Sequence, residues 1–201
     1  MIRHSGICFL FFLAALAISC SSSKRFTRNY YSENEVVLQK VLHLFEKLYE
    51  KNPFALEIVD RRFSRINLEI HTDTVKYIYN FNLPEPFLID TLRKYGFDTR
   101  DMNGLLQGME TAHIAWISKL DYYEDEQLKF LVFLSVRDRK LTALLRSEKY
   151  FTIVFFKEAQ PYDVRGRLLD RDDLEKNRLI NGEVYRRVTD SVFYALSGRF
   201  R

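Results

Sequence analysis

Cysteine is almost absent from this chain of 201 residues, which has only Cys8 and Cys20. No cysteine follows residue 20, so the remaining chain has no disulfide, no thiolate metal site and no cysteine nucleophile. Its stability must therefore come from a hydrophobic core. With 47% hydrophobic and 15% aromatic residues, the composition is sufficient for such a core and is not typical of a disordered protein.

An excess of positive charge is also missing once the first residues are set aside. The formal net charge of the whole chain is +4, but Arg3 and three basic residues within 24–28 precede the first acidic residue, Glu33. Without these four charges, residues 29–201 have a net charge of zero. A neutral domain argues against a nucleic acid partner, because phosphate binding needs a basic surface. The three basic residues either lie on anionic lipid headgroups or belong to a soluble linker.

Long hydrophobic runs are limited to one stretch, residues 7–18. This stretch has about 12 residues, whereas a membrane-spanning helix needs roughly 20. Arg3 and His4 precede it, and small polar residues follow it from Ser19 onward. A basic start, a short apolar core and a small-residue exit are the parts of a secretory signal.

The exit of this leader, Leu16-Ala17-Ile18-Ser19-Cys20, resembles the lipobox of bacterial lipoproteins. In that family, lipid is attached to the cysteine thiol and the signal peptide is cut just before it. The resemblance implies a signal peptide over residues 1–19, lipid on Cys20 and a tether through residue 30. The family prefers leucine where Ala17 stands. Ser21 resembles the outer-membrane sorting pattern of enteric bacteria, so we expect a protein of the cell envelope, attached to the outer membrane.

Other interpretations of the leader remain open. Ala15-Leu16-Ala17 is an A-x-A pattern, and ordinary cleavage after Ala17 would release a soluble protein. The leader is alternatively retained as a signal anchor, or it forms a buried helix of a cytosolic domain. Cys8 is a weaker candidate for lipidation, because almost no apolar run precedes it.

Residues 31–201 are expected to form one α+β domain. Ser32 and Glu35 have the spacing of a capping box and predict a helix over residues 33–51. Pro84 and Pro86 open a second helix that Gly96 closes, and apolar residues at helical spacing predict a third over 102–109. Alternating or continuous apolar runs predict strands at 54–60, 66–71, 75–81, 112–122, 127–137 and 150–156.

The second half of the chain is less regular. Residues 141–145 predict an edge strand or one helical turn, and residues 161–181 have no clear pattern. Residues 184–196 carry apolar side chains at helical spacing and predict a C-terminal helix closed by Gly198. We therefore expect an antiparallel sheet of five or six strands with helices packed on one face.

Catalytic candidates are few, because the common phosphate-loop, nucleophile-elbow and zinc motifs are absent. Glu69, His71 and Asp73 follow at a spacing of two, which places them on one face of an extended strand. Such a row can bind a divalent metal or carry acid–base chemistry. Alternatively it is the solvated face of the strand, with Asp73 twisted away by a turn. We predict no cofactor.

Three further residues are candidates for ligand binding. His113, Trp116 and Tyr122 either line a pocket, with the aromatic rings stacking on sugars, or serve as ordinary strand and core residues. The acidic tip Glu124-Asp125-Glu126 is expected to be a solvated turn. Two functions follow: a lipid-anchored accessory module that binds another envelope protein, or a membrane-tethered hydrolase or metal-dependent enzyme that acts on envelope polymers.

Overall fold

The computed structural model describes residues 29–124, 126–137 and 150–198. The chain divides into two compact units, Met1–Glu35 and Val36–Arg201. In the first unit, the described residues 29–35 are helical, and the helical stretch ends at residue 49. Ser32 lies inside this helix, so the predicted start at residue 33 was wrong; Glu35 accepts a 3.4 Å hydrogen bond from the Tyr31 hydroxyl.

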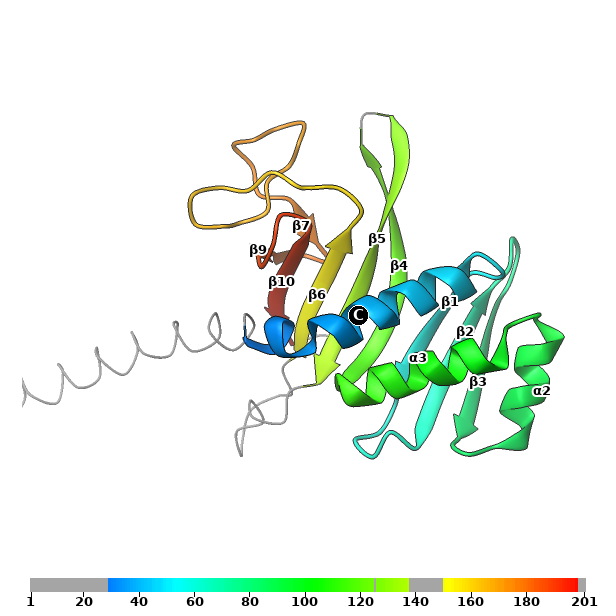
Figure 1. The fold of residues 1–201 in the computed structure, drawn as a ribbon. Helices are drawn as coiled ribbons and strands as arrows, with labels where there is room; N and C mark the ends of the chain where they lie inside the picture. The colour runs from blue at the N-terminus through cyan, green and yellow to red at the C-terminus, as the bar shows by residue number, and fades with distance from the viewer. Residues whose placement is uncertain (1–28, 125, 138–149, 199–201) are drawn as a thin grey trace, which may run out of the picture. The chain divides into compact units, whose positions relative to one another are not determined.

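The second unit contains an antiparallel sheet of eight strands in the order β3-β2-β1-β4-β5-β6-β10-β9 (Figure 1). The α+β class is confirmed, but the sheet has more strands than the expected five or six. The strands of this sheet are β1 Phe54–Ile58, β2 Arg65–His71, β3 Lys76–Asn82, β4 Ile114–Glu124, β5 Gln127–Arg137, β6 Tyr150–Phe156, β9 Arg186–Arg187 and β10 Val192–Ser197. Strands β7 Leu179–Ile180 and β8 Glu183–Val184 form a separate two-stranded ribbon.

Helices cover one face of the sheet, as expected. Residues 36–49 and α3 (Thr99–Thr111) lie across this face, and the shorter α2 (Pro86–Lys94) lies beside β3 (Figure 1). The ring of Phe54 on β1 is 5.0 Å from the ring of Phe45, which anchors the first of these helices. Gly108 permits the close approach of α3, because a Cβ at this position would lie 2.6 Å from a methyl group of Val41. None of the helices in the described residues is long and apolar enough to cross a membrane.

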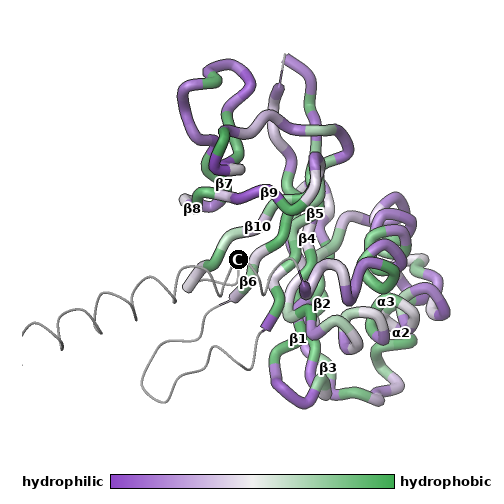
Figure 2. Tube along the Cα trace, turned by 60° about the vertical axis from the view of Figure 1, so that its left-hand side comes forward, coloured by the Kyte–Doolittle hydropathy of each residue, from purple (hydrophilic) through white to green (hydrophobic). Residues whose placement is uncertain are grey.

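On the opposite face, residues 157–188 cover the central strands and contain little regular structure before they end in the edge strand β9 (Figure 2). Leu168, Ile180 and Tyr185 of this segment pack on side chains of the central strands. The Tyr185 hydroxyl also donates a 2.8 Å hydrogen bond to Thr152 Oγ1 on β6. The sheet therefore has a core on each of its two faces.

The predicted C-terminal helix was wrong, because residues 184–196 contribute instead to strands β8, β9 and β10. Val192 and Tyr194 pair in register with Phe155 and Ile153 of β6. Val192, Phe193, Tyr194 and Ala195 are all buried, so both faces of β10 are covered. A run that is apolar on both faces suits a covered strand, and it outweighs the helical spacing of a few valines. The strand or turn expected at 141–145 lies outside the described residues.

Glu124 is buried, so the expectation of a fully solvated acidic tip was wrong for this residue. Its carboxylate is 2.8 Å from Lys129 Nζ and 3.3 Å from both Arg171 Nε and Arg178 Nη1. The Arg178 guanidinium also lies 4.2 Å from the ring centroid of Tyr122. Both arginines belong to the covering segment, so this carboxylate fastens residues 157–188 to the β4–β5 hairpin.

Replacing Glu124 with glutamine is expected to loosen the covering segment. Lys129, Arg171 and Arg178 would lose the anion that they share. We therefore expect the free energy of unfolding to fall by about 1–3 kcal/mol, a range that allows for the partial exposure of the three cations. Urea unfolding followed by fluorescence of Trp116, which is buried under the segment, measures the change. Glu126→Gln is the matched control, because Glu126 is exposed at the same tip. Equal effects of the two substitutions would contradict the assignment.

Candidate binding pocket between α2 and α3

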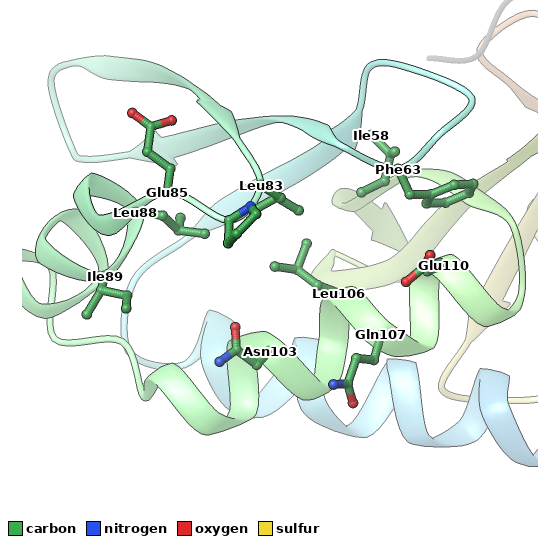
Figure 3. Close-up of a pocket in the computed structure, with 11 residues that line it drawn as sticks. Ile58, Phe63, Leu83, Glu85, Leu88, Ile89, Asn103, Leu106, Gln107 and Glu110 are labelled. Carbon is green, nitrogen blue, oxygen red and sulfur yellow. The ribbon is translucent and has the colours of Figure 1, made fainter.

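A pocket of about 370 Å³ opens where α2, α3 and the end of β3 meet (Figure 3). Its floor is apolar: Leu88 of α2 and Leu106 of α3 are both buried. Its rim carries amides and carboxylates. The pocket is lined by Ile58, Phe63, Leu83, Pro84, Glu85, Leu88, Ile89, Asn103, Leu106, Gln107 and Glu110.

The connection from β3 to α2 forms one side of the pocket. Pro86 occupies the first turn of α2, where its fixed φ and missing N–H are tolerated. Glu85, the residue that begins the helix, accepts a 2.8 Å hydrogen bond through Oε2 from the backbone N–H of Asn82. This bond holds the Glu85 side chain back toward the end of β3. Asp98 caps α3 on the facing side by accepting a hydrogen bond from the Asp101 N–H.

Phe63 forms another part of the wall, on the turn between β1 and β2. It has a φ of +56°, a value that non-glycine residues seldom adopt. The Asp60 carboxylate stabilises the turn by accepting bonds from Ser64 Oγ at 2.7 Å, Ser64 N at 2.9 Å and Arg65 N at 2.9 Å. Burial alone would raise the pKa of Asp60, but these hydrogen bonds lower the pKa to about 2. The Phe63 ring lies 5.8 Å from that of His113, which also has a positive φ, of +53°.

The pocket is polar at its edges and negative in charge. Figure 3 shows Glu85 and Glu110 on opposite sides of a row of apolar side chains, with the amides of Asn103 and Gln107 along α3. No cation pairs with either carboxylate among the described residues. The lining residues include no serine, cysteine or histidine that would act as a nucleophile or base. This arrangement suits reversible binding of an apolar group that carries a nearby positive charge.

The predicted row of Glu69, His71 and Asp73 is only partly assembled. Glu69 and His71 share one face of β2, with His71 Nε2 3.7 Å from the Glu69 carboxylate. The ammonium of Lys76 contacts the same carboxylate. Asp73 lies in the exposed turn between β2 and β3. Within the described part of the chain, no three His, Cys, Asp or Glu side chains are grouped closely enough to hold a metal ion.

The three predicted ligand-binding residues do not form one site. Trp116 and Tyr122 lie on the face of β4 that residues 157–188 cover, and both belong to its apolar cluster. The Trp116 indole N–H donates a 3.0 Å bond to Ser118 Oγ. His113 is exposed at the start of β4 and reaches the pocket only through Phe63. Cys20 lies outside the described residues.

Comparison with known proteins adds no assignment. No protein-family model, no curated protein and no solved structure matches the chain. No motif in the sequence predicted the pocket, although two local patterns lie in its walls. Asp60 and Ser64 have the spacing of a side-chain-capped turn, and Pro84 and Pro86 flank Glu85 at the start of a helix.

Replacing Asp60 with asparagine is expected to weaken the turn that carries Phe63. Loss of the charged acceptor should lower the free energy of unfolding by about 1 kcal/mol at neutral pH. Since the folded pKa is below the usual 3.8, the wild-type advantage is complete above pH 3.8 and is lost as the pH falls through about 2. Urea unfolding at several pH values measures it. Asp73→Asn, in the next turn, is the control, and an advantage that does not shrink in acid would contradict the argument.

Proposed function

We propose that this chain is a lipid-anchored protein of the bacterial cell envelope whose folded domain is a non-enzymatic binding module. The observation that carries the anchor is the leader exit at Leu16-Ala17-Ile18-Ser19-Cys20. Lipid on Cys20 would attach the protein to the membrane, and Ser21 favours the outer membrane. Two or more fatty chains give stable anchoring, because each buried methylene contributes about 0.8 kcal/mol.

The pocket between α2 and α3 supports the binding role. Its volume of about 370 Å³ lies within the usual range for ligand sites and accommodates one large apolar side chain. Glu85 and Glu110 favour a lysine or arginine beside that side chain, because charge complementarity favours encounter and orientation. Asn103 and Gln107 are four residues apart on α3, so their amides lie on one helix face and can bond an extended backbone. The expected partner is a basic, apolar segment of another envelope protein.

The alternative function, a membrane-tethered hydrolase or metal-dependent enzyme, rests on Glu69 and His71. Their separation of 3.7 Å is close enough for a shared ligand. Lys76, however, already pairs with the Glu69 carboxylate, and a metal ion would have to displace that ammonium. The binding module is therefore the better-supported proposal.

Intact-mass measurement of protein extracted from native envelopes tests the anchor. We expect a chain that begins at Cys20 and carries the added mass of the lipid. The Cys20→Ala variant should keep its leader, because the proposed processing requires the thiol. An unmodified thiol at Cys20 in the wild type, or an uncut leader, would contradict the proposal.

Nuclear magnetic resonance of the side-chain amides of Asn103 and Gln107 tests the pocket. A short Lys-Leu-Lys peptide is expected to shift both signals, whereas a Glu-Leu-Glu peptide of the same length is not. Glu110→Lys should weaken binding of the basic peptide by about tenfold, since a favourable charge contact becomes a repulsive one. Glu126→Lys, remote on the β4–β5 hairpin, serves as the control. Unchanged binding by the Glu110 variant would contradict the proposed site, and stoichiometric metal that is lost in His71→Ala would favour the enzyme.

A further inference from the structure

Strand β3 is the long outer strand of the eight-stranded sheet, and it pairs only with β2. The opposite outer strand, β9, has just two residues. The register pairs Arg65 with Asn82 and His71 with Lys76. Hydrogen bonds at both ends of the β2–β3 hairpin show which residues of β3 direct their backbone groups toward β2. Leu83 N donates to Ser64 O, and Thr72 N donates to Val75 O.

In an antiparallel pair, successive residues direct their N–H and C=O groups alternately toward the partner strand and away from it. These two bonds therefore determine the direction of every backbone group on β3. The odd-numbered residues direct their N–H and C=O groups toward β2, and the even-numbered residues direct theirs outward. The outward N–H of Asn82 is already bonded to Glu85, which agrees with this assignment. Lys76, Ile78 and Asn80 are exposed, and no backbone partner is recorded for their outward groups in the described part of the chain.

We propose that this edge pairs antiparallel with the same edge of a second copy of the chain, with the two-fold axis at Ile78. In this register Ile78 lies opposite its own counterpart, and Lys76 lies opposite Asn80. All three residues with outward groups are then matched with one another, so each dimer closes a complete short ladder. If the axis moved toward Asn80, the ladder would have to include Asn82 or Pro84. The N–H of Asn82 is already bonded, and Pro84 has no N–H.

Side-chain charge and ring stacking both favour this register for pairing with a second copy of the chain. An axis at Lys76 would place two ammonium groups opposite each other, whereas an axis at Ile78 avoids this repulsion. Lysine on an outer strand usually discourages pairing, but the Lys76 ammonium is held by Glu69 of β2. On the helix-covered face, Tyr77 of one copy would lie opposite Tyr79 of the other. These two rings already stack within one chain, at a centroid distance of 6.4 Å.

Disulfide trapping tests the axis in the full-length chain. Facing residues of a hydrogen-bonded antiparallel pair have Cα atoms about 5.5 Å apart, which is within the range of a disulfide. Ile78→Cys should therefore form a covalent dimer under mild oxidation. Leu128→Cys is the matched control, since Leu128 is an equally exposed strand residue, 61% against 56% for Ile78, at a distant hairpin tip. Equal trapping of both variants, or none at Ile78, would overturn the proposal.

Sedimentation of the full-length chain in mild detergent provides an independent measurement. The wild type is expected to form dimers that dissociate on dilution. Ile78→Lys should raise the dimer dissociation constant by about tenfold or more, because two lysines would meet at the axis. Leu128→Lys should leave it unchanged. A wild type that stays monomeric at high concentration, or a dimer indifferent to Ile78→Lys, would overturn the proposal.

Discussion

The central strands must be shielded from water on both faces, and the arrangement of the second unit follows from this constraint. Strand β6 is buried along its whole length, and β10 is buried on both sides. Helices alone cover one face, so the other face requires residues 157–188, although they contain little regular structure. Each large side chain such as Phe193 contributes about 2 kcal/mol when buried in this way. Since residues 29–201 contain no cysteine, this double burial takes the place of disulfides.

Local patterns predicted the parts of the fold that depend on neighbouring residues. The alternation of Ile66, Leu68 and Ile70 is confirmed as the buried face of β2, and the hairpin to β3 is confirmed at the expected turn. The prediction was wrong at residues 184–196, where helical spacing coincided with a strand buried on both faces. It was also wrong for Glu124, whose partner Arg178 is 54 residues away along the chain. No local pattern reports such a distant ion pair.

The candidate sites show the same contrast between relations within one strand and contacts between residues far apart in the sequence. A period of two correctly placed Glu69 and His71 on one face, because that relation lies within a single strand. The pocket combines the β1–β2 turn, the β3–α2 connection and α3, and each segment alone resembles an ordinary turn or helix. One of these segments, α3, packs closely against the helix of residues 36–49 because Gly108 has no Cβ to meet Val41, and this contact joins residues far apart in the sequence.

Glu85 connects the pocket with the outer strand. Its carboxylate bonds the Asn82 N–H and so removes one outward group from the edge of β3, while its side chain lines the pocket beside α2. The same bond therefore shortens the unpaired edge to Lys76, Ile78 and Asn80, and it holds the negative charge of Glu85 at the rim of the pocket beside β3. A basic ligand that drew the carboxylate away would free the Asn82 N–H and lengthen the edge. If both proposals hold, occupancy of the pocket and pairing of the strand would be coupled through the Glu85 side chain.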